Sequence, residues 1–198
     1  MIGKYNVKCC SVILAGGLST RMGTNKALLP LKNKLVIGHI TEEMKLLSSK
    51  TVIISNDPGP YCFLGLPVIQ DNYLDQGPLA GLEAALKRIE VDYFLVSACD
   101  TPFISKNVYQ LLYSHLKEAD AVVPIYQKKI HPLSGIYHKR IHSAIQHQLD
   151  AGHRKIKTLF ENINVRYVEN FHGISDKELE KHFFNMNDKS QYQQAKLL

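Results

Sequence analysis

The chain has 198 residues, 45% of them hydrophobic and 21% charged, a composition typical of soluble globular proteins. No apolar run approaches the roughly 20 residues of a membrane span, and residues 1–8 contain no secretory signal. The four cysteines include no Cys-x-x-Cys pair. We therefore expect a reduced, cytoplasmic protein without a membrane partner. The net charge of +6 suits an anionic small molecule, and no dense basic run with interleaved aromatic residues favours nucleic acid.

Short apolar runs alternate with amphipathic stretches through the first two thirds of the chain. The runs predicted as buried strands are residues 8–15, 51–55, 66–70, 93–98 and 120–125, and those predicted as helices are 36–49, 78–90 and 105–119. Strand, helix and strand repeated in this way indicate right-handed crossover units. The predicted fold class is therefore α/β, with a doubly wound, mostly parallel sheet in a three-layer α/β/α sandwich.

The last third is less regular. Residues 131–137 and 164–170 are predicted as strands, 139–152 as a helix ending at Gly152, and a final helix is expected near Asp188. Three histidines, His138, His142 and His147, step by four and five along the predicted helix. Because a metal site needs tighter convergence, we interpret them as surface histidines and not as zinc ligands.

The loop after the first predicted strand, LAGGLSTRMGTNK, combines glycines with two cations. Its spacing fits neither the P-loop nor the G-x-G-x-x-G pattern. The adjacent Gly16 and Gly17 can expose successive backbone N–H groups to an anion, Arg21 can bind phosphate oxygens in a bidentate manner, and Lys26 can face a triphosphate. The alternative is a glycine turn with two surface cations.

The string LAGGLSTRMGTNKALLPL, residues 14–31, resembles the signature loop of nucleotidyltransferases, and in particular that of the molybdenum cofactor guanylyltransferases (the MobA family). Residues 71–81 and the Cys-Asp-Thr-Pro string at 99–102 are similar to further motifs of that family. The resemblance implies a nucleotidyltransferase-like variant of the Rossmann architecture. Because the sequence contains no long linker, repeat or low-complexity segment, we expect one domain, residues 1–198, with a nucleotide-binding half at roughly 8–104 and an acceptor-binding half at 105–198.

Two carboxylates follow predicted strands, where an α/β sheet binds its ligands. Asp71 can accept the two N–H groups of a guanine edge, although it could also cap a turn or helix. Asp100 suits Mg²⁺, which takes one or two protein carboxylates together with phosphate and water oxygens. Both aspartates together could hold a metal, but the resemblance assigns the metal to Asp100. Cys99 is interpreted as a small buried hydrophobic residue.

The resemblance implies the following site. Its catalytic residues are Arg21, Lys26 and Asp100, its metal ligand is Asp100, and its nucleotide-binding residues are Leu14, Ala15, Gly16, Gly17, Lys26, Asp71, Gly81 and Asp100. Asn56 is a further candidate nucleotide contact. Arg154 and Lys155 could bind the phosphate of the second substrate or could equally be exposed cations. Near the C-terminus, Asp188 and Lys189 replace the Thr-Pro of the family pattern, and Asp188 can still cap a helix.

The reaction implied by the resemblance is Mg²⁺-dependent transfer of GMP from GTP to the terminal phosphate of molybdopterin or Mo-molybdopterin, with release of pyrophosphate. Other proteins of molybdenum cofactor biosynthesis are candidate partners. Two alternatives remain open at this point. One is a cytidylyl- or sugar-phosphate nucleotidyltransferase of the same fold, and the other is a GTP-binding module without catalysis.

Overall fold

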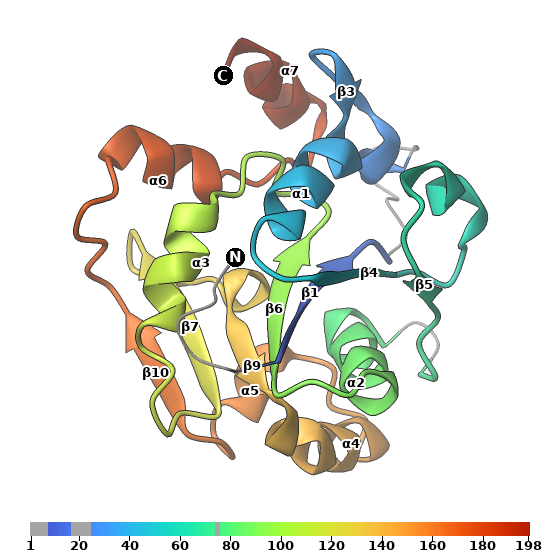
Figure 1. Cartoon of the computed structure of the whole chain (residues 1–198), viewed down its shortest axis with the longest axis vertical. Coiled ribbons are helices and arrows are strands. Elements are labelled where there is room, and N and C mark those ends of the chain that lie inside the picture. The colour runs from blue at the N-terminus through green and yellow to red at the C-terminus, as the bar shows by residue number, and fades with distance from the viewer. Residues whose placement is uncertain (1–7, 17–24, 74–75) are drawn as a thin grey trace.

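The computed structural model describes residues 8–16, 25–73 and 76–198. Among these residues, eight strands form one sheet in the order β10-β7-β9-β6-β1-β4-β5, with β8 paired to β7 (Figure 1). The strands are β1 (Cys9–Leu14), β4 (Lys50–Ile54), β5 (Val68–Ile69), β6 (Tyr93–Ala98), β7 (Ala121–Tyr126), β8 (Lys129–Ile130), β9 (Ile136–His138) and β10 (Val165–Val168). A separate hairpin joins β2 (Pro30–Leu31) to β3 (Lys34–Leu35).

The sheet is mostly parallel, which confirms the predicted fold class. β1 runs parallel to β4 and β6, and the pairs β4–β5 and β7–β10 are also parallel. Two strands are exceptions: β9 lies antiparallel between β6 and β7, and the short β8 pairs antiparallel with β7. In the register of the three central strands, Leu14 is opposite both Ile54 and Ala98. The carboxyl ends of β1, β4 and β6 therefore lie side by side.

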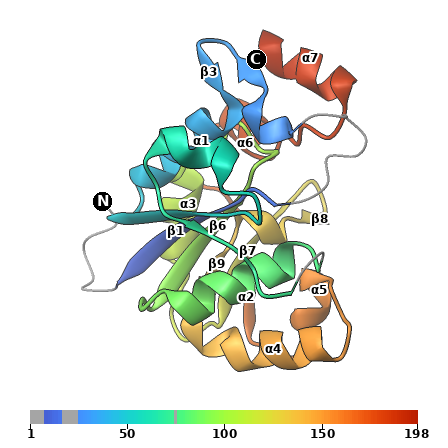
Figure 2. The same ribbon diagram turned by 90° about the vertical axis from the view of Figure 1, so that its right-hand side faces the viewer.

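Helices cover both faces of the sheet. They are α1 (Val36–Lys45), α2 (Pro78–Arg88), α3 (Lys106–Tyr113), α4 (His142–Asp150), α5 (Ile156–Leu159), α6 (Asp176–His182) and α7 (Lys189–Leu197). Figure 2 shows α1, α3 and α6 on one side of the sheet and α2, α4 and α5 on the other. None of the helices within the described ranges is long and apolar enough to span a membrane.

Two hydrophobic clusters fill the spaces between these layers, because successive residues of a strand face opposite sides of a sheet. Ile13 of β1 packs in the cluster under α1 and α3, whereas its neighbour Val12 packs in the cluster under α2 and α4. The central strands β1, β4 and β6 are thus buried on both faces. Continuous burial explains why the strands read as unbroken apolar runs in the sequence.

Several local signals act as predicted. α2 begins at Pro78, and Gly152 takes a φ of 80° just after α4. Asp188 caps α7, since its side chain accepts a hydrogen bond from the Gln191 N–H at 2.9 Å.

The strand predicted over residues 131–137 is wrong in its first half. Residues Pro132–Ser134 form a 3₁₀ turn, because Pro132 has no N–H to donate to a neighbouring strand, and only Ile136–His138 join the sheet.

The three histidines do not share one helix, which corrects the prediction. His138 ends β9 and His142 begins α4, with a 3₁₀ turn between them. His142 is also not simply a surface residue, since its Nε2 lies 3.0 Å from Oε1 of the fully buried Glu83. That contact joins α4 to α2.

A fourth histidine, His182 at the end of α6, is buried in a polar network. Its Nδ1 accepts the backbone N–H of Ser105 at 2.8 Å, so the neutral ring carries its proton on Nε2 and donates it to Ser134 Oγ at 2.6 Å. Burial lowers the pKa of His182 to about 3, and the charge of His131 lowers the pKa further to a smaller extent. His182 is therefore neutral in the folded protein at ordinary pH.

This depressed pKa predicts acid sensitivity. Folding favours the neutral form of His182. Its contribution to the free energy of unfolding is therefore complete above the ordinary histidine pKa of about 6.5, and it is lost as the pH falls from there towards 3. In His182→Gln, which keeps a donor and an acceptor but does not titrate, we expect the urea midpoint to fall less steeply between pH 6.5 and 4.5 than in the wild type. Parallel slopes for the two proteins would contradict the prediction.

Candidate active site

The predicted site residues of the first and sixth strands meet at one edge of the sheet. The Ala15 N–H donates to the Ile54 carbonyl at 2.9 Å, and the Cys99 N–H donates to the Leu14 carbonyl at 3.1 Å. Hydrogen bonding therefore continues one residue beyond the strands before the chains separate. Leu14, Ala15 and Asp100 lie together at this edge, where ligands of such sheets bind.

The glycine-rich loop leaves the sheet at Gly16. A Cβ built on Gly16 would meet no described atom within 4 Å, so packing by the described protein does not require glycine there. Open space beside the backbone fits a position where a ligand approaches closely. The next predicted residues, Gly17 and Arg21, lie outside the described residues.

Lys26 is held at the other end of that loop. It begins a 3₁₀ turn, Lys26–Leu28, whose cap Asn25 accepts the Ala27 N–H at 3.1 Å through its side chain. The Nζ of Lys26 donates to Oδ1 of Asn187 at 3.2 Å. Because Lys26 also lowers the pKa of Asp100, its ammonium acts on that carboxylate. Lys26 and Asp100 therefore interact electrostatically at this edge of the sheet, and their catalytic roles stay predictions.

Asp100 follows β6 and is half-buried. Burial raises the pKa of its carboxyl above the ordinary value, and the positive charge of Lys26 partly opposes that rise. The backbone of Asp100 is fixed from the C-terminal part of the chain, since its carbonyl accepts the Met186 N–H at 2.8 Å. Its neighbour Cys99 has a pKa raised by burial to about 12, so the thiol stays protonated and is no nucleophile.

Asp71 lies beyond the end of β5 and is joined to Asn56, which follows β4. The Asp71 N–H donates to Oδ1 of Asn56 at 3.0 Å, and Nδ2 of Asn56 donates to Oδ2 of Asp71 at 3.0 Å. The carbonyl of Asn56 in turn accepts Nε2 of Gln70 at 3.0 Å. Asn56 therefore orients the carboxylate of Asp71.

Gly81 is buried inside α2 and faces the sheet. A Cβ at this position would lie 3.0 Å from Cδ2 of Leu14 and 3.1 Å from Cγ2 of Ile54. Glycine thus lets α2 pack closely against β1 and β4. This packing supplies a reason for Gly81 that is independent of a ligand, and its role as a nucleotide contact stays a prediction.

Sequence reasoning compared the segment between α6 and α7 with the family pattern but gave no role to the two asparagines of its Asn-Met-Asn string. Asn185 and Asn187 line a cavity of about 310 Å³. Its other lining residues are Tyr126, Gln127, Lys129, His131, Glu180, Phe183 and Gln191. Through Asn187 this cavity adjoins Lys26. Burial lowers the pKa of His131, and the charges of Lys129 and Lys157 lower it further.

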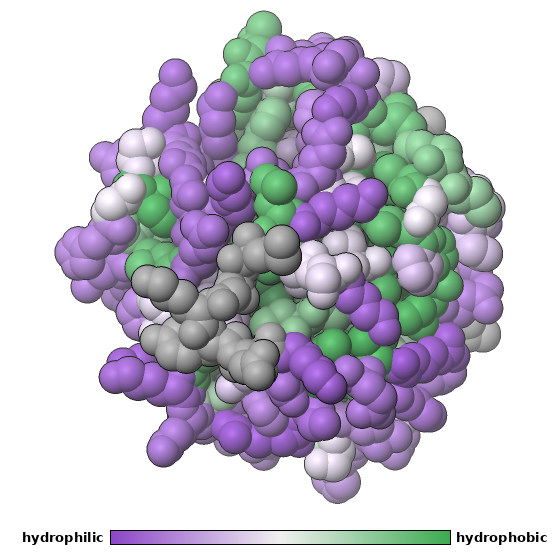
Figure 3. Space-filling view, viewed as in Figure 1, coloured by the Kyte–Doolittle hydropathy of each residue, from purple (hydrophilic) through white to green (hydrophobic). Residues whose placement is uncertain are grey.

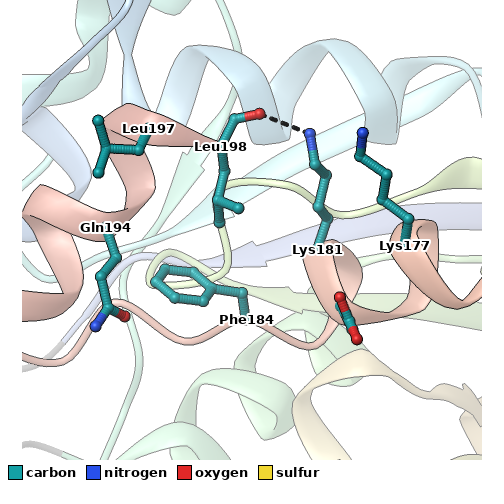
Figure 4. Close-up of a pocket in the computed structure, with 7 residues that line it drawn as sticks. Lys177, Lys181, Phe184, Gln194, Leu197 and Leu198 are labelled. Atoms are coloured by element: carbon teal, nitrogen blue, oxygen red, sulfur yellow. Dashed lines mark hydrogen bonds between the residues drawn. The ribbon is translucent and has the colours of Figure 1, made fainter.

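The predicted cations Arg154 and Lys155 are exposed and lie directly before α5. A larger hollow of about 710 Å³ lies between α6 and α7, where Phe184, Leu197 and Leu198 line it and Lys181 donates to the Leu198 carbonyl at 2.6 Å (Figure 4). None of the predicted site residues lines this hollow. We therefore place the candidate active site at the strand ends and not between these helices.

The strand-end site offers backbone space at Gly16, an ammonium group at Lys26 and a carboxylate at Asp100. This combination suits a polyphosphate, whose charge the ammonium neutralises while the carboxylate binds a hard cation. Asp71 and Asn56 add hydrogen-bonding groups at the neighbouring strand ends. The arrangement can align reacting phosphates without a nucleophilic side chain.

Comparisons with known proteins identify the family of the chain. Residues 11–168 match the family model of the MobA-like NTP transferase domain. The chain is 35% identical over 182 residues to a protein of Carboxydothermus hydrogenoformans, covering 91% of each chain, and 36% identical over 192 residues to one of Clostridium perfringens, covering 94% of this chain and 96% of the relative. Both are named "Probable molybdenum cofactor guanylyltransferase".

Among solved structures, the fold is similar to molybdopterin-guanine dinucleotide biosynthesis protein A from Archaeoglobus fulgidus. The TM-score is 0.81 at 26% identity, and the match covers 95% of this chain and 97% of the other. A protein from Aquifex aeolicus matches with a TM-score of 0.78 at 27% identity. These likenesses extend over both halves of the sheet.

Proposed function

The chain belongs to the MobA-like NTP transferase family, and we propose that it transfers GMP from GTP to the terminal phosphate of molybdopterin, releasing pyrophosphate. The observation that carries the proposal is that adjacent residues link Lys26 to the end of β6: Asn187 accepts Nζ of Lys26, Met186 donates to the Asp100 carbonyl, and the charge of Lys26 acts on the Asp100 carboxyl. The names of its relatives, which specify a guanylyl group and the molybdenum cofactor, support the choice of substrates.

In this proposal the nucleotide lies along the strand ends. The backbone from Leu14 to Gly16 borders the phosphates, and the open space beside Gly16 lets them approach. Asp71, oriented by Asn56, accepts the N1–H and 2-amino groups of guanine. Gly17 and Arg21 belong to the same proposal on sequence grounds alone.

A magnesium ion fits the donor chemistry at Asp100. Partial burial raises the pKa of this carboxyl, so a bound cation would favour the ionised form that burial disfavours. When bound there, Mg²⁺ would supply charge neutralisation at the α-phosphate and the departing pyrophosphate. Asp100 would be its protein ligand, with phosphate and water oxygens completing the shell.

The chain's own residues then perform two tasks. Lys26 neutralises charge on the leaving pyrophosphate, and the strand-end backbone holds the nucleotide in line with the acceptor. A general base is not required, because the attacking phosphate is already anionic at neutral pH. This explains why a protonated Cys99 can directly precede Asp100 without taking part.

The acceptor pocket in this proposal is the cavity of about 310 Å³ beside Asn187. Its amides, on Asn185, Asn187 and Gln191, suit the hydrogen-bonding edges of a pterin, and Lys129 at its rim suits a phosphate. Because Asn187 also binds Lys26, an acceptor in the cavity would lie next to the proposed pyrophosphate position.

The proposal is tested by measuring pyrophosphate release from GTP and from CTP, with molybdopterin and Mg²⁺ present. We expect release with GTP and little with CTP. Faster release with CTP would favour a cytidylyltransferase. Tight GTP binding without acceptor-dependent release would favour a binding module, and either result would overturn the proposal.

Asp71→Asn tests the guanine contact. An amide keeps one acceptor but turns a donor towards guanine, so we expect kcat/KM for GTP to fall about 10- to 100-fold, mostly through KM. The matched control is Asp57→Asn, which makes the same change at an exposed carboxylate of the Asn56 loop. An equal loss in both variants, or none in Asp71→Asn, would contradict the assigned contact.

A further inference from the structure

The segment between β4 and β5 contains a 3₁₀ helix, η2 (Gly59–Leu64), that presents two aromatic residues in opposite directions. Phe63 is 60% exposed, and the hydrophobic side chains at the right of Figure 3 lie over this segment. Tyr61 is only 1% exposed and packs in the same core cluster as Ile13 and Ala15 of the first strand region. Its ring is thus directed under the candidate active site.

The hydroxyl of Tyr61 joins the two described ends of the glycine-rich loop. It donates to the Ala15 carbonyl at 3.1 Å and accepts Nδ2 of Asn25 at 2.9 Å. Ala15 directly follows β1, and Asn25 directly precedes Lys26. One buried oxygen atom therefore fixes the distance between the end of the central strand and the start of the Lys26 turn.

The hydrogen bond between Asn25 and Tyr61 is linked to Lys26 through the turn that Asn25 caps. The side chain of Asn25 binds Tyr61 through its amide nitrogen while its oxygen accepts the Ala27 N–H, which caps the 3₁₀ turn that Lys26 begins. Burial raises the pKa of Tyr61, so the hydroxyl retains the proton that it donates to Ala15. Tyr61, Asn25 and Lys26 thus form a chain of contacts that leads to the ammonium group beside Asp100.

We propose that Tyr61 is a positioning residue for nucleotidyl transfer, whose hydroxyl holds Asn25 against the Ala15 carbonyl and so sets the place of Lys26. The inference rests on the proposed function, because it concerns the rate of that reaction. Tyr61 touches no substrate. Its effect passes through Lys26, which must meet charge that develops on the leaving pyrophosphate.

The test is Tyr61→Phe, which removes only the hydroxyl. The matched control is Tyr109→Phe, because the Tyr109 ring is also fully buried and its hydroxyl donates to a backbone carbonyl, that of Val96, at 2.6 Å. We expect similar shifts of the urea midpoint in both variants. In Tyr61→Phe we expect kcat for pyrophosphate release to fall about 10- to 100-fold with a smaller change in KM for GTP, while Tyr109→Phe stays near the wild type.

A double-mutant cycle identifies the route of the effect. If Tyr61 acts through Lys26, Lys26→Met combined with Tyr61→Phe should be no slower than Lys26→Met alone. Hydrogen exchange of the Ala27 amide should also be faster in Tyr61→Phe than in Tyr109→Phe, a readout that does not depend on turnover.

Independent, multiplying effects of the two substitutions would overturn the proposed route, as would a Tyr61→Phe enzyme that matches the Tyr109→Phe control in kcat. These results differ from a failure of the proposed function. If the wild type releases no pyrophosphate from any nucleotide, the transferase assignment falls, and the role of Tyr61 in transfer falls with it. If the wild type is active and only the variants behave unexpectedly, the positioning role alone is wrong.

Discussion

Replacing Asp100 by asparagine is expected to lower the rate of pyrophosphate release by about 10²–10³-fold, the range found for other preorganised charged groups at active sites. The substitution keeps the size of the side chain but removes the negative charge that a divalent cation needs. The loss should appear mainly in kcat, and more Mg²⁺ should be needed for half-maximal rate. Binding of Mn²⁺ in the presence of GTP, followed by electron paramagnetic resonance, should weaken in parallel.

The same substitution should not harm folding. Because burial raises the pKa of Asp100, the ionised carboxyl at neutral pH disfavours the folded state, and asparagine removes that penalty. We therefore expect a urea midpoint at or above that of the wild type. The control is Asp92→Asn, which changes a carboxylate at the opposite end of β6, where Asp92 accepts the Lys8 N–H. An active Asp100→Asn enzyme, or one that lost activity only because it unfolded, would contradict the assignment.

Replacing Lys26 by methionine is expected to lower kcat by a similar factor of about 10²–10³. Methionine preserves much of the apolar stem but removes the ammonium that lies beside Asp100 and binds Asn187. KM for GTP should rise less than kcat falls, because charge on the pyrophosphate increases in the transition state. Steady-state kinetics with varied GTP separate these two quantities.

Lys34→Met is the matched control for this second prediction. Lys34 lies on the neighbouring hairpin, is exposed and pairs with Glu42, an ion pair of the kind that contributes little to stability. Its loss changes the net charge by the same amount and should leave kcat near the wild-type value. Near-normal turnover of Lys26→Met would show that the leaving-group role is wrong. Equal losses in both variants would indicate a general electrostatic effect instead.

The central strands and the residues that follow them could be predicted from the sequence. Apolar runs such as 93–98 are buried on both faces, and a parallel sheet brings their carboxyl ends to one edge. The meeting of Ala15 and Asp100 follows from those two facts, whereas Lys26 was predicted from the loop motif alone. The positions of Gly17 and Arg21 are outside the described residues, so their parts in the site remain predictions.

The C-terminal wall of the site could not be predicted in the same way. Met186 and Asn187 follow no strand and belong to no periodic pattern, and their place depends on how α6 packs against α3 and the sheet. The hydrogen bond of the Tyr61 hydroxyl could not be predicted either, because no sequence pattern indicates which backbone carbonyl a tyrosine in a short 3₁₀ helix will bind. Both features depend on tertiary packing rather than on local pattern.

The contacts of Met186 with Asp100 and of Asn187 with Lys26 also bear on how the protein is made. β1, β4 and β6 are synthesised long before residues 186 and 187. A nascent chain can therefore pair its central strands before the C-terminal wall of the site has formed. Synthesis of the last helices then completes the site. A stalled or prematurely terminated product should therefore bind GTP poorly even when its strands have already assembled.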